Sequence, residues 1–128
     1  MNVLAMVRKE YKVDPSRIYL MGHSMGGSGV WHLAHKYPDI WAGIGPMSGT
    51  LSEADFNYRK VSKIPAIVAV GGQETPLVTA SKTEVAGLKA AGGKAVLVEV
   101  PNGTHMSMIP VSTPQILAFF AEQKKGRP

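Results

Sequence analysis

The stretch Ile18-Tyr19-Leu20-Met21-Gly22-His23-Ser24-Met25-Gly26 (residues 18–26) decides how this chain is expected to fold. Its first half is a short apolar run typical of a buried strand, and its second half is the pattern G-x-S-x-G. Apolar side chains at helical spacing follow, so we expect Ser24 on a sharp turn from strand into helix. We predict that Gly22 and Gly26 give this turn its room and that the backbone of Ser24 is strained.

A serine held in this way points its hydroxyl above the edge of the sheet, close to the free N–H groups of the following helix. These groups can stabilise a developing negative charge, and the N–H of Met25 is the first donor expected there. Because a serine hydroxyl is a weak nucleophile by itself, it also needs a base and an orienting carboxylate. The alternative interpretation is an ordinary serine in a glycine-rich turn.

The composition indicates one ordered globular domain over residues 1–128. The chain is 45% hydrophobic and 18% charged, and it has no cysteine, which excludes disulfides and cysteine-ligated metal. No run approaches the ~18 apolar residues of a membrane span and no secretory leader is recognisable, so we expect a cytoplasmic protein without membrane contact. The net charge of +5 comes from scattered side chains with one small cluster, Lys124, Lys125 and Arg127, and does not indicate nucleic-acid binding.

Strand-like and helix-like segments alternate along the chain. Strands are predicted at 17–21, 41–45, 64–70 and 95–100, and helices at 1–12, 25–37, 78–91 and 113–125. The segment 48–62 is polar and is expected to be a loop with at most a helical turn. In the last helix we expect a proline in the first turn and four buried apolar side chains, namely Pro114 and then Ile116, Leu117, Phe119 and Phe120. The alternation favours an α/β domain with about four parallel strands and flanking helices.

Two further polar residues follow predicted strands. Glu74 comes after the strand at 64–70, and His105 comes after the strand at 95–100. Because the carboxyl ends of parallel strands meet at one edge of a sheet, we expect both side chains near Ser24. His32 and His35 are spaced to share a metal, but no carboxylate stands at matching spacing, so we expect no metal site.

The chain resembles the α/β-hydrolase fold, in particular esterases of the polyhydroxybutyrate-depolymerase and feruloyl-esterase type. The matching segments are 14–27, Met47-Ser48-Gly49, 64–74 and Gly103-Thr104-His105, which together span nearly the whole chain. The order serine, acid, histidine is the order of this family. Most members carry aspartate at the acid position, where this chain has a glutamate.

The resemblance implies a serine carboxylesterase that acts on small short-acyl esters through an acyl-enzyme, without cofactor or metal. By position, Ser24 is the nucleophile, His105 the general base and then acid, and Glu74 the carboxylate that orients the histidine. Asp55 occupies another place where such hydrolases can carry the acid. A peptidase is a weaker expectation, and a catalytically idle remnant that serves as an interaction module is the alternative.

The resemblance covers only the second half of the family's fold. The strand at 17–22, internal in the family, is therefore expected to have one unpaired edge. We expect a homo-oligomer that covers this edge. The absent half would supply a second oxyanion donor, for which Gly26, a side chain or a neighbouring subunit could substitute.

The residues around the predicted site leave two readings open. The four methionines there either line a soft acyl pocket or fill gaps in the core, and these are Met25, Met47, Met106 and Met108. His23, the variable position inside the serine motif, is expected to be structural.

Overall fold

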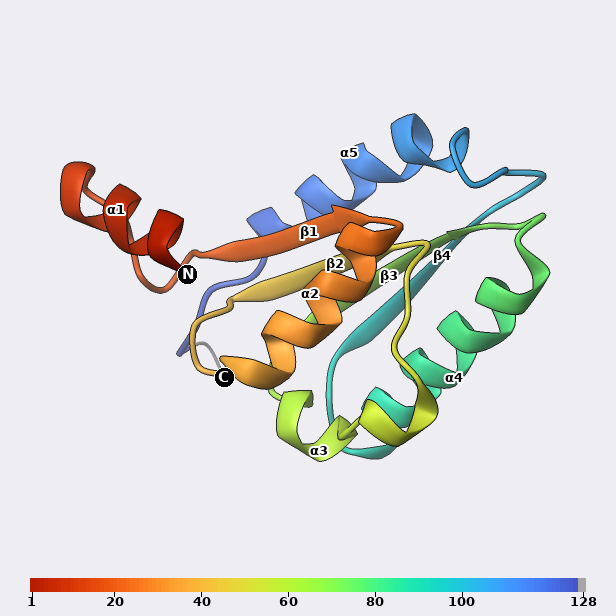
Figure 1. Cartoon of the computed structure of the whole chain (residues 1–128), viewed down its shortest axis with the longest axis horizontal. Coiled ribbons are helices and arrows are strands. Elements are labelled where there is room, and N and C mark those ends of the chain that lie inside the picture. Colours follow the sequence, from red (N-terminus) through yellow and green to blue (C-terminus); the bar gives the residue numbers. More distant parts are fainter. Residues whose placement is uncertain (127–128) are drawn as a thin grey trace.

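The computed structural model describes residues 1–126 (Figure 1), so Arg127 of the basic cluster lies outside the described residues. The chain forms α1 (Asn2–Glu10), β1 (Tyr19–His23), α2 (Met25–Lys36), β2 (Gly43–Met47), the 3-10 helix η1 (Glu53–Asp55), α3 (Tyr58–Val61), β3 (Ala66–Gly71), α4 (Thr75–Ala90), β4 (Ala95–Val100) and α5 (Met108–Ala121). This order confirms the predicted alternation of strands and helices. The segment 48–62, predicted as a loop with at most a helical turn, is a loop that contains two short helical turns, η1 and α3.

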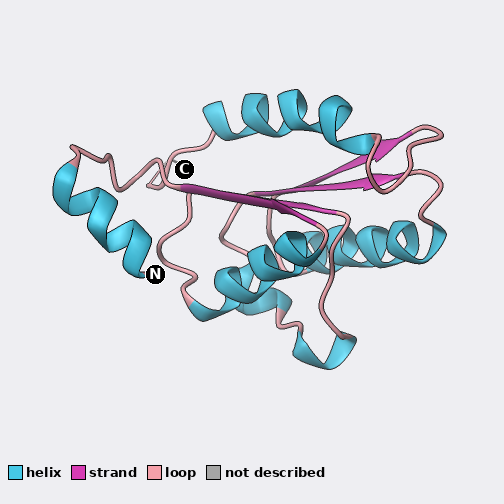
Figure 2. Cartoon of the chain, turned by 45° about the horizontal axis from the view of Figure 1, so that its top comes forward, coloured by secondary structure: helices cyan, strands magenta, loops and turns pink. Residues whose placement is uncertain are grey.

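The four strands form one parallel sheet in the order β1-β2-β3-β4. Helices α2 and α4 cover one face of the sheet and α5 covers the other (Figures 1 and 2). A right-handed crossover between neighbouring parallel strands puts each connecting helix on the same face, which explains why α2 and α4 lie together. The predicted α/β architecture with four parallel strands is confirmed.

Strand β3 carries the centre of the core, and every one of its residues is buried. Its side chains alternate between the two faces, as the strand period requires. Ala66 and Val68 pack with side chains of α2 and α4, whereas Ile67 and Ala69 pack with side chains of α5. Burial on both faces accounts for the unbroken apolar run from which this strand was predicted.

Helix α5 begins at Met108, upstream of the predicted start at 113, so Pro114 lies inside the helix and not in its first turn. The earlier start follows from two reciprocal bonds: the N–H of Thr104 donates to Ser107 Oγ (2.8 Å), and the N–H of Ser107 donates to Thr104 Oγ1 (3.1 Å). The prediction that Leu117 is buried was wrong, since its side chain is 54% exposed. Helix α4 likewise begins at Thr75 and not at 78.

Helix α1 stands apart from the rest of the molecule (Figure 1). None of its residues is buried, and Val3, Met6 and Val7 are exposed. Leu4 alone packs partly against the core. Helix α1 is therefore little covered by the rest of the fold, and β1, which follows it, is an edge strand of the sheet.

One carboxyl group lies inside the fold on α4. Glu84 is 1% exposed, and its Oε2 accepts a hydrogen bond from Thr50 Oγ1. Its Oε1 has no hydrogen-bond partner among residues 1–126. Burial raises the pKa of Glu84 to about 7, because the bond from Thr50 offsets only part of the cost of burying the charge.

This raised pKa predicts a pH-dependent stability. The folded chain keeps the Glu84 proton up to about pH 7, whereas the unfolded chain loses it near the ordinary value of 4.5, so stability falls as the pH rises between the two. Glu84→Gln removes this dependence. The free energy of unfolding of the parent should therefore fall by about 2 kcal/mol relative to that of Glu84→Gln when the pH is raised from about 5 to about 8. Urea unfolding at both pH values measures this, with the exposed Glu53→Gln as control. Equal pH dependence in parent and Glu84→Gln would contradict it.

Candidate active site

The turn between β1 and α2 holds Ser24 in a strained backbone conformation. Its φ is 61° and its ψ is −118°, a region that side-chain-bearing residues rarely adopt. Its N–H donates to the carbonyl of Met47 at the end of β2 (2.8 Å), which ties the turn to the neighbouring strand. The predicted strained turn from strand to helix is confirmed.

The room for this turn comes partly from other glycines than those predicted. A Cβ on Gly22 would lie 2.5 Å from the carbonyl oxygen of Gly26, so Gly22 is required as predicted. A Cβ on Gly26 would meet nothing within 4 Å, so the prediction for Gly26 was wrong. The close approaches are instead at Gly27, 2.7 Å from the carbonyl oxygen of Met47, and at Gly49, 2.4 Å from that of Ser24.

These distances predict opposite outcomes for two alanine substitutions. Gly22→Ala should displace the start of α2 and lower the melting temperature by several degrees, because its Cβ would overlap the carbonyl oxygen of Gly26. Gly26→Ala meets open space inside α2, so its melting temperature should equal or exceed that of the parent. Thermal melts of both variants check this. Equal losses in the two would contradict the account of the turn.

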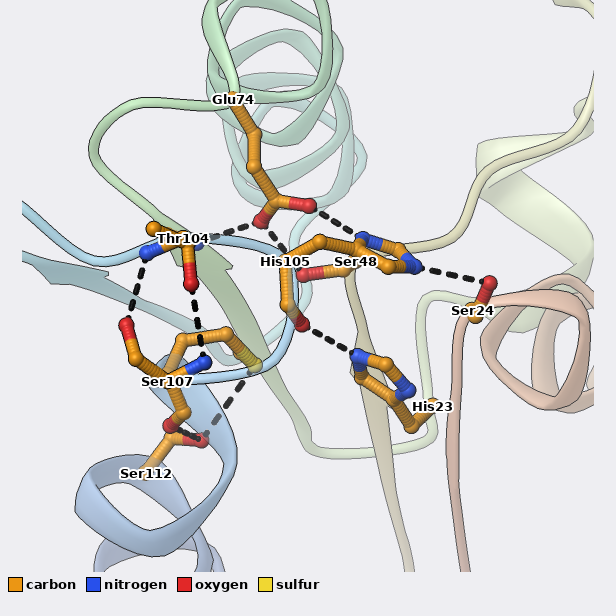
Figure 3. Close-up of polar contacts among 10 residues, drawn as sticks. His23, Ser24, Ser48, Glu74, Thr104, His105, Ser107 and Ser112 are labelled. Atoms are coloured by element: carbon orange, nitrogen blue, oxygen red, sulfur yellow. Dashed lines mark hydrogen bonds and ion pairs between the residues drawn. The ribbon is translucent and has the colours of Figure 1, made fainter.

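The structure brings Ser24, His105 and Glu74 together at the carboxyl edge of the sheet (Figure 3). Ser24 Oγ lies 2.9 Å from His105 Nε2, and His105 Nδ1 contacts Glu74 Oε1. With Nδ1 protonated and donating to the carboxylate, Nε2 is left free to accept the serine proton. A hydroxyl, an imidazole and a carboxylate thus stand in hydrogen-bonded sequence.

The loops that carry the acid and the histidine are bound to each other. The N–H of Gly72 donates to the carbonyl of Val100 (2.8 Å), and the N–H of Gln73 donates to that of Gly103 (2.9 Å). A Cβ on Gly71 would lie 2.5 Å from the Gly103 oxygen, so only glycine allows this approach. These contacts fix the distance between Glu74 and His105 through the backbone.

The carboxylate of Glu74 has donors on both oxygens. Its Oε2 accepts from Ser48 Oγ (2.7 Å) and from the N–H of Gly71 (2.8 Å), while Oε1 faces His105. Burial by itself raises the pKa of Glu74, but the hydrogen bonds from Ser48, His105 and Gly71 outweigh it and hold the pKa below its usual value. The carboxylate is therefore ionised at neutral pH.

His23 also contacts the site, through a backbone group. Its Nε2–H donates to the carbonyl oxygen of His105 (2.6 Å), and the two imidazole rings lie 4.6 Å apart between centroids. His23 thereby anchors the loop that carries His105. The structural role predicted for His23 is confirmed, but its partner, a backbone group 82 residues further along the chain, could not be predicted from the sequence.

The remaining candidates lie elsewhere. Asp55 is an exposed residue of η1 that accepts from Ser52 Oγ (2.6 Å), and Glu74 holds the place beside His105. His35 binds the carbonyl of Trp31 through Nδ1 and accepts from the N–H of Asn57 through Nε2. Within residues 1–126 no group of three or more His, Cys, Asp or Glu side chains is placed to hold a metal ion.

The four methionines divide between the two readings. Met47 and Met108 are buried in the core, whereas Met106 is exposed and Met25 is 86% exposed. The core explanation therefore holds for Met47 and Met108, and Met25 and Met106 lie at the surface beside Ser24 and His105.

No helix in the described part of the chain is long and apolar enough to span a bilayer.

Comparison with known proteins points to esterases. A family described as "Putative esterase" matches residues 1–125. Cutinase 1 of Thermobifida cellulosilytica is 33% identical over 98 residues, which are 75% of this chain and 36% of the cutinase. The esterase NocK of Nocardia uniformis subsp. tsuyamanensis, itself described as putative, is 33% identical over 66 residues, 52% of this chain and 19% of that protein.

Solved structures agree on the fold. A thermostable esterase superimposes with a TM-score of 0.83 at 26% identity, covering 97% of this chain and 35% of its own. The BES protein from Bacillus cereus superimposes with a TM-score of 0.79 at 16% identity, covering 92% of this chain and 50% of its own, and supports the fold alone. The chain spans half or less of the length of these relatives.

Proposed function

Since this chain belongs to the esterase family of the α/β-hydrolase fold, we propose that it hydrolyses small carboxylic esters through an acyl-enzyme on Ser24. The observation that carries the proposal is the hydrogen-bonded series from Ser24 Oγ through His105 to Glu74. Such a series turns a weakly nucleophilic hydroxyl into one that can attack a carbonyl carbon.

In the proposed first half-reaction, Ser24 Oγ attacks the ester carbonyl while His105 Nε2 takes its proton. The carboxylate of Glu74 stabilises the imidazolium that forms. The carbonyl oxygen becomes an oxyanion, which the N–H of Met25 and the positive end of α2 stabilise. His105 then gives its proton to the departing alcohol, and the acyl group stays on Ser24.

In the second half-reaction, His105 takes a proton from water, and the water oxygen attacks the acyl carbon. His105 then returns the proton to Ser24 Oγ as the bond between Oγ and the acyl carbon breaks, which releases the acid and regenerates the serine. The N–H of Gly26 stands next to that of Met25 in the first turn of α2, and we propose it as the second oxyanion donor. Both donors are backbone N–H groups, so the oxyanion is stabilised without a side chain.

We propose short acyl groups and several ester types as substrates. Met25 is 86% exposed beside the nucleophile, and the side chain of His105 is 44% exposed. A site flanked by exposed side chains buries little of a long acyl chain and therefore gains little affinity from added methylenes. Hydrolysis rates over a series of p-nitrophenyl esters of increasing acyl length measure the preference of this chain.

Labelling with an alkyl fluorophosphonate tests the proposed function. This reagent reacts with activated serines, so one label per chain should appear on the peptide that contains Ser24. The urea-unfolded chain is the control and should take up no label. Ester turnover by a chain that remains unlabelled at Ser24 would contradict the proposal.

We also propose that a second copy of the chain covers the free edge of β1. This strand ends the sheet, and α1 exposes apolar side chains such as Val3 and Met6. A two-fold axis at the edge would pair β1 with its copy in antiparallel fashion and continue the sheet across the two copies, with β4 as its outer strand on each side.

Sedimentation velocity tests the proposed oligomer. The parent should sediment as a dimer or larger species, and Met6→Lys should weaken the association because it puts a charge on the apolar side of α1. The matched control is Val111→Lys, at an exposed position of α5. A monomer throughout a dilution series up to high concentration would contradict the prediction.

A further inference from the structure

We propose that Ser48 is a positioning residue whose buried hydroxyl holds the carboxylate of Glu74 in the orientation that serves His105. Ser48 follows β2 directly and is 4% exposed. Its Oγ donates to Glu74 Oε2 at 2.7 Å (Figure 3). The inference rests on the proposed function, because Glu74 acts on the ester only through His105.

The two oxygens of the carboxylate have separate partners. Oε1 faces His105, while Oε2 accepts from Ser48 Oγ and from the N–H of Gly71 at 2.8 Å. Two donors on Oε2 fix the rotation of the carboxylate plane, and this rotation decides whether Oε1 meets His105 Nδ1. The Ser48 hydroxyl is therefore placed to control the geometry of the base.

A glutamate needs this control more than an aspartate would. It has one more rotatable bond between backbone and carboxylate, and each freely rotating bond spreads the carboxylate over more positions. The backbone of Glu74 is held by its own N–H, which donates to the carbonyl of Gly71 at 3.0 Å. The carboxylate at the end of the side chain is held by His105 at Oε1 and by the hydrogen bonds from Ser48 and Gly71 at Oε2.

The backbone of Ser48 supports the same reading. Its φ is 51°, in the left-handed region that glycine adopts without cost and other residues rarely do. Its N–H donates to the carbonyl of Ala69 (2.9 Å), so the conformation is fixed by β3. Glycine would adopt this backbone conformation at lower cost, so the contribution of the serine is its hydroxyl, which donates to Glu74.

Ser48→Gly therefore separates the hydroxyl from the fold. Because hydrogen bonds to charged groups have large effects, kcat for p-nitrophenyl butyrate should fall about 10- to 100-fold with KM little changed. The melting temperature should change little, because relief of the strain at φ 51° offsets the loss of the hydrogen bond to Glu74. Ser48→Ala keeps the Cβ and provides the same test should the glycine variant fail to fold. Unchanged kcat in both variants would overturn the proposal.

A double-mutant cycle assigns the effect to Glu74. Ser48→Gly should add little to the loss already caused by Glu74→Gln, because both act through one carboxylate. The matched control is Ser112→Ala, which removes another buried hydroxyl, one that donates to the carbonyl of Met108 (2.7 Å) on α5. Full additivity in the cycle, or an equal loss in Ser112→Ala, would overturn the proposal.

A ¹³C NMR titration of the Glu74 carboxyl tests the same bond without turnover. The pKa of Glu74 should be higher in Ser48→Gly than in the parent, because the hydroxyl stabilises the ionised form. The same pKa in both chains would overturn the inference. A raised pKa in a chain that hydrolyses no ester would support the role of Ser48 and refute the proposed function, so the two failures are distinct.

Discussion

Ser24→Ala should lower kcat/KM for p-nitrophenyl butyrate by about 10⁴-fold or more, since loss of a triad nucleophile removes most of the rate enhancement of a serine hydrolase. The variant keeps the Cβ, the turn and its hydrogen bond to Met47, so its melting temperature should match that of the parent. The remaining activity should come from the oxyanion donors and from binding alone, which act without the hydroxyl.

The control for this loss is Ser62→Ala, which removes an exposed hydroxyl that donates to the carbonyl of Arg59 (3.0 Å). It should hydrolyse the ester at the parent rate. If Ser24→Ala retained more than about a tenth of the parent's kcat/KM, the residual rate would be too high for a chain without its nucleophile.

His105→Ala should cause a loss of similar size, at least about 10³-fold in kcat/KM. Without the imidazole, the Ser24 proton has no acceptor at 2.9 Å, and the departing alcohol has no donor. The two losses should not add: the variant that carries both Ser24→Ala and His105→Ala should be about as active as either one, because the residues act as a unit.

His32→Ala is the matched control, since His32 is an exposed histidine on α2. It should retain the parent's activity. Losses that multiplied in the double variant would mean that Ser24 and His105 act independently, and would contradict the proposed relay.

The fold was largely predictable because its strands are apolar runs between turn residues, and these carry local signals. Their bounds were less so: β1 and β2 end at His23 and Met47, past the apolar runs, where pairing between the strands extends them. The start of α5 was missed because the reciprocal bonds of Thr104 and Ser107 begin the helix without apolar periodicity.

The site was predictable as far as it depends on strand ends. Ser24, Glu74 and His105 all follow strands, and parallel strands bring such residues to one edge. The roles of Gly49 and Ser48 depend on contacts with segments distant in the chain, at the carbonyl of Ser24 and the carboxylate of Glu74. No spacing within the sequence expresses such contacts. The same reason explains why Gly26 was wrongly chosen as a required glycine.

The most direct test of the account is the mass of the acyl-enzyme. The chain is mixed with p-nitrophenyl butyrate, quenched in acid within the first turnover, digested and analysed by mass spectrometry. We expect one butyryl group on the peptide that contains Ser24. When the chain has been unfolded in urea before mixing, we expect none. Release of p-nitrophenol at the enzymatic rate with no butyryl group on Ser24 would contradict the central claim.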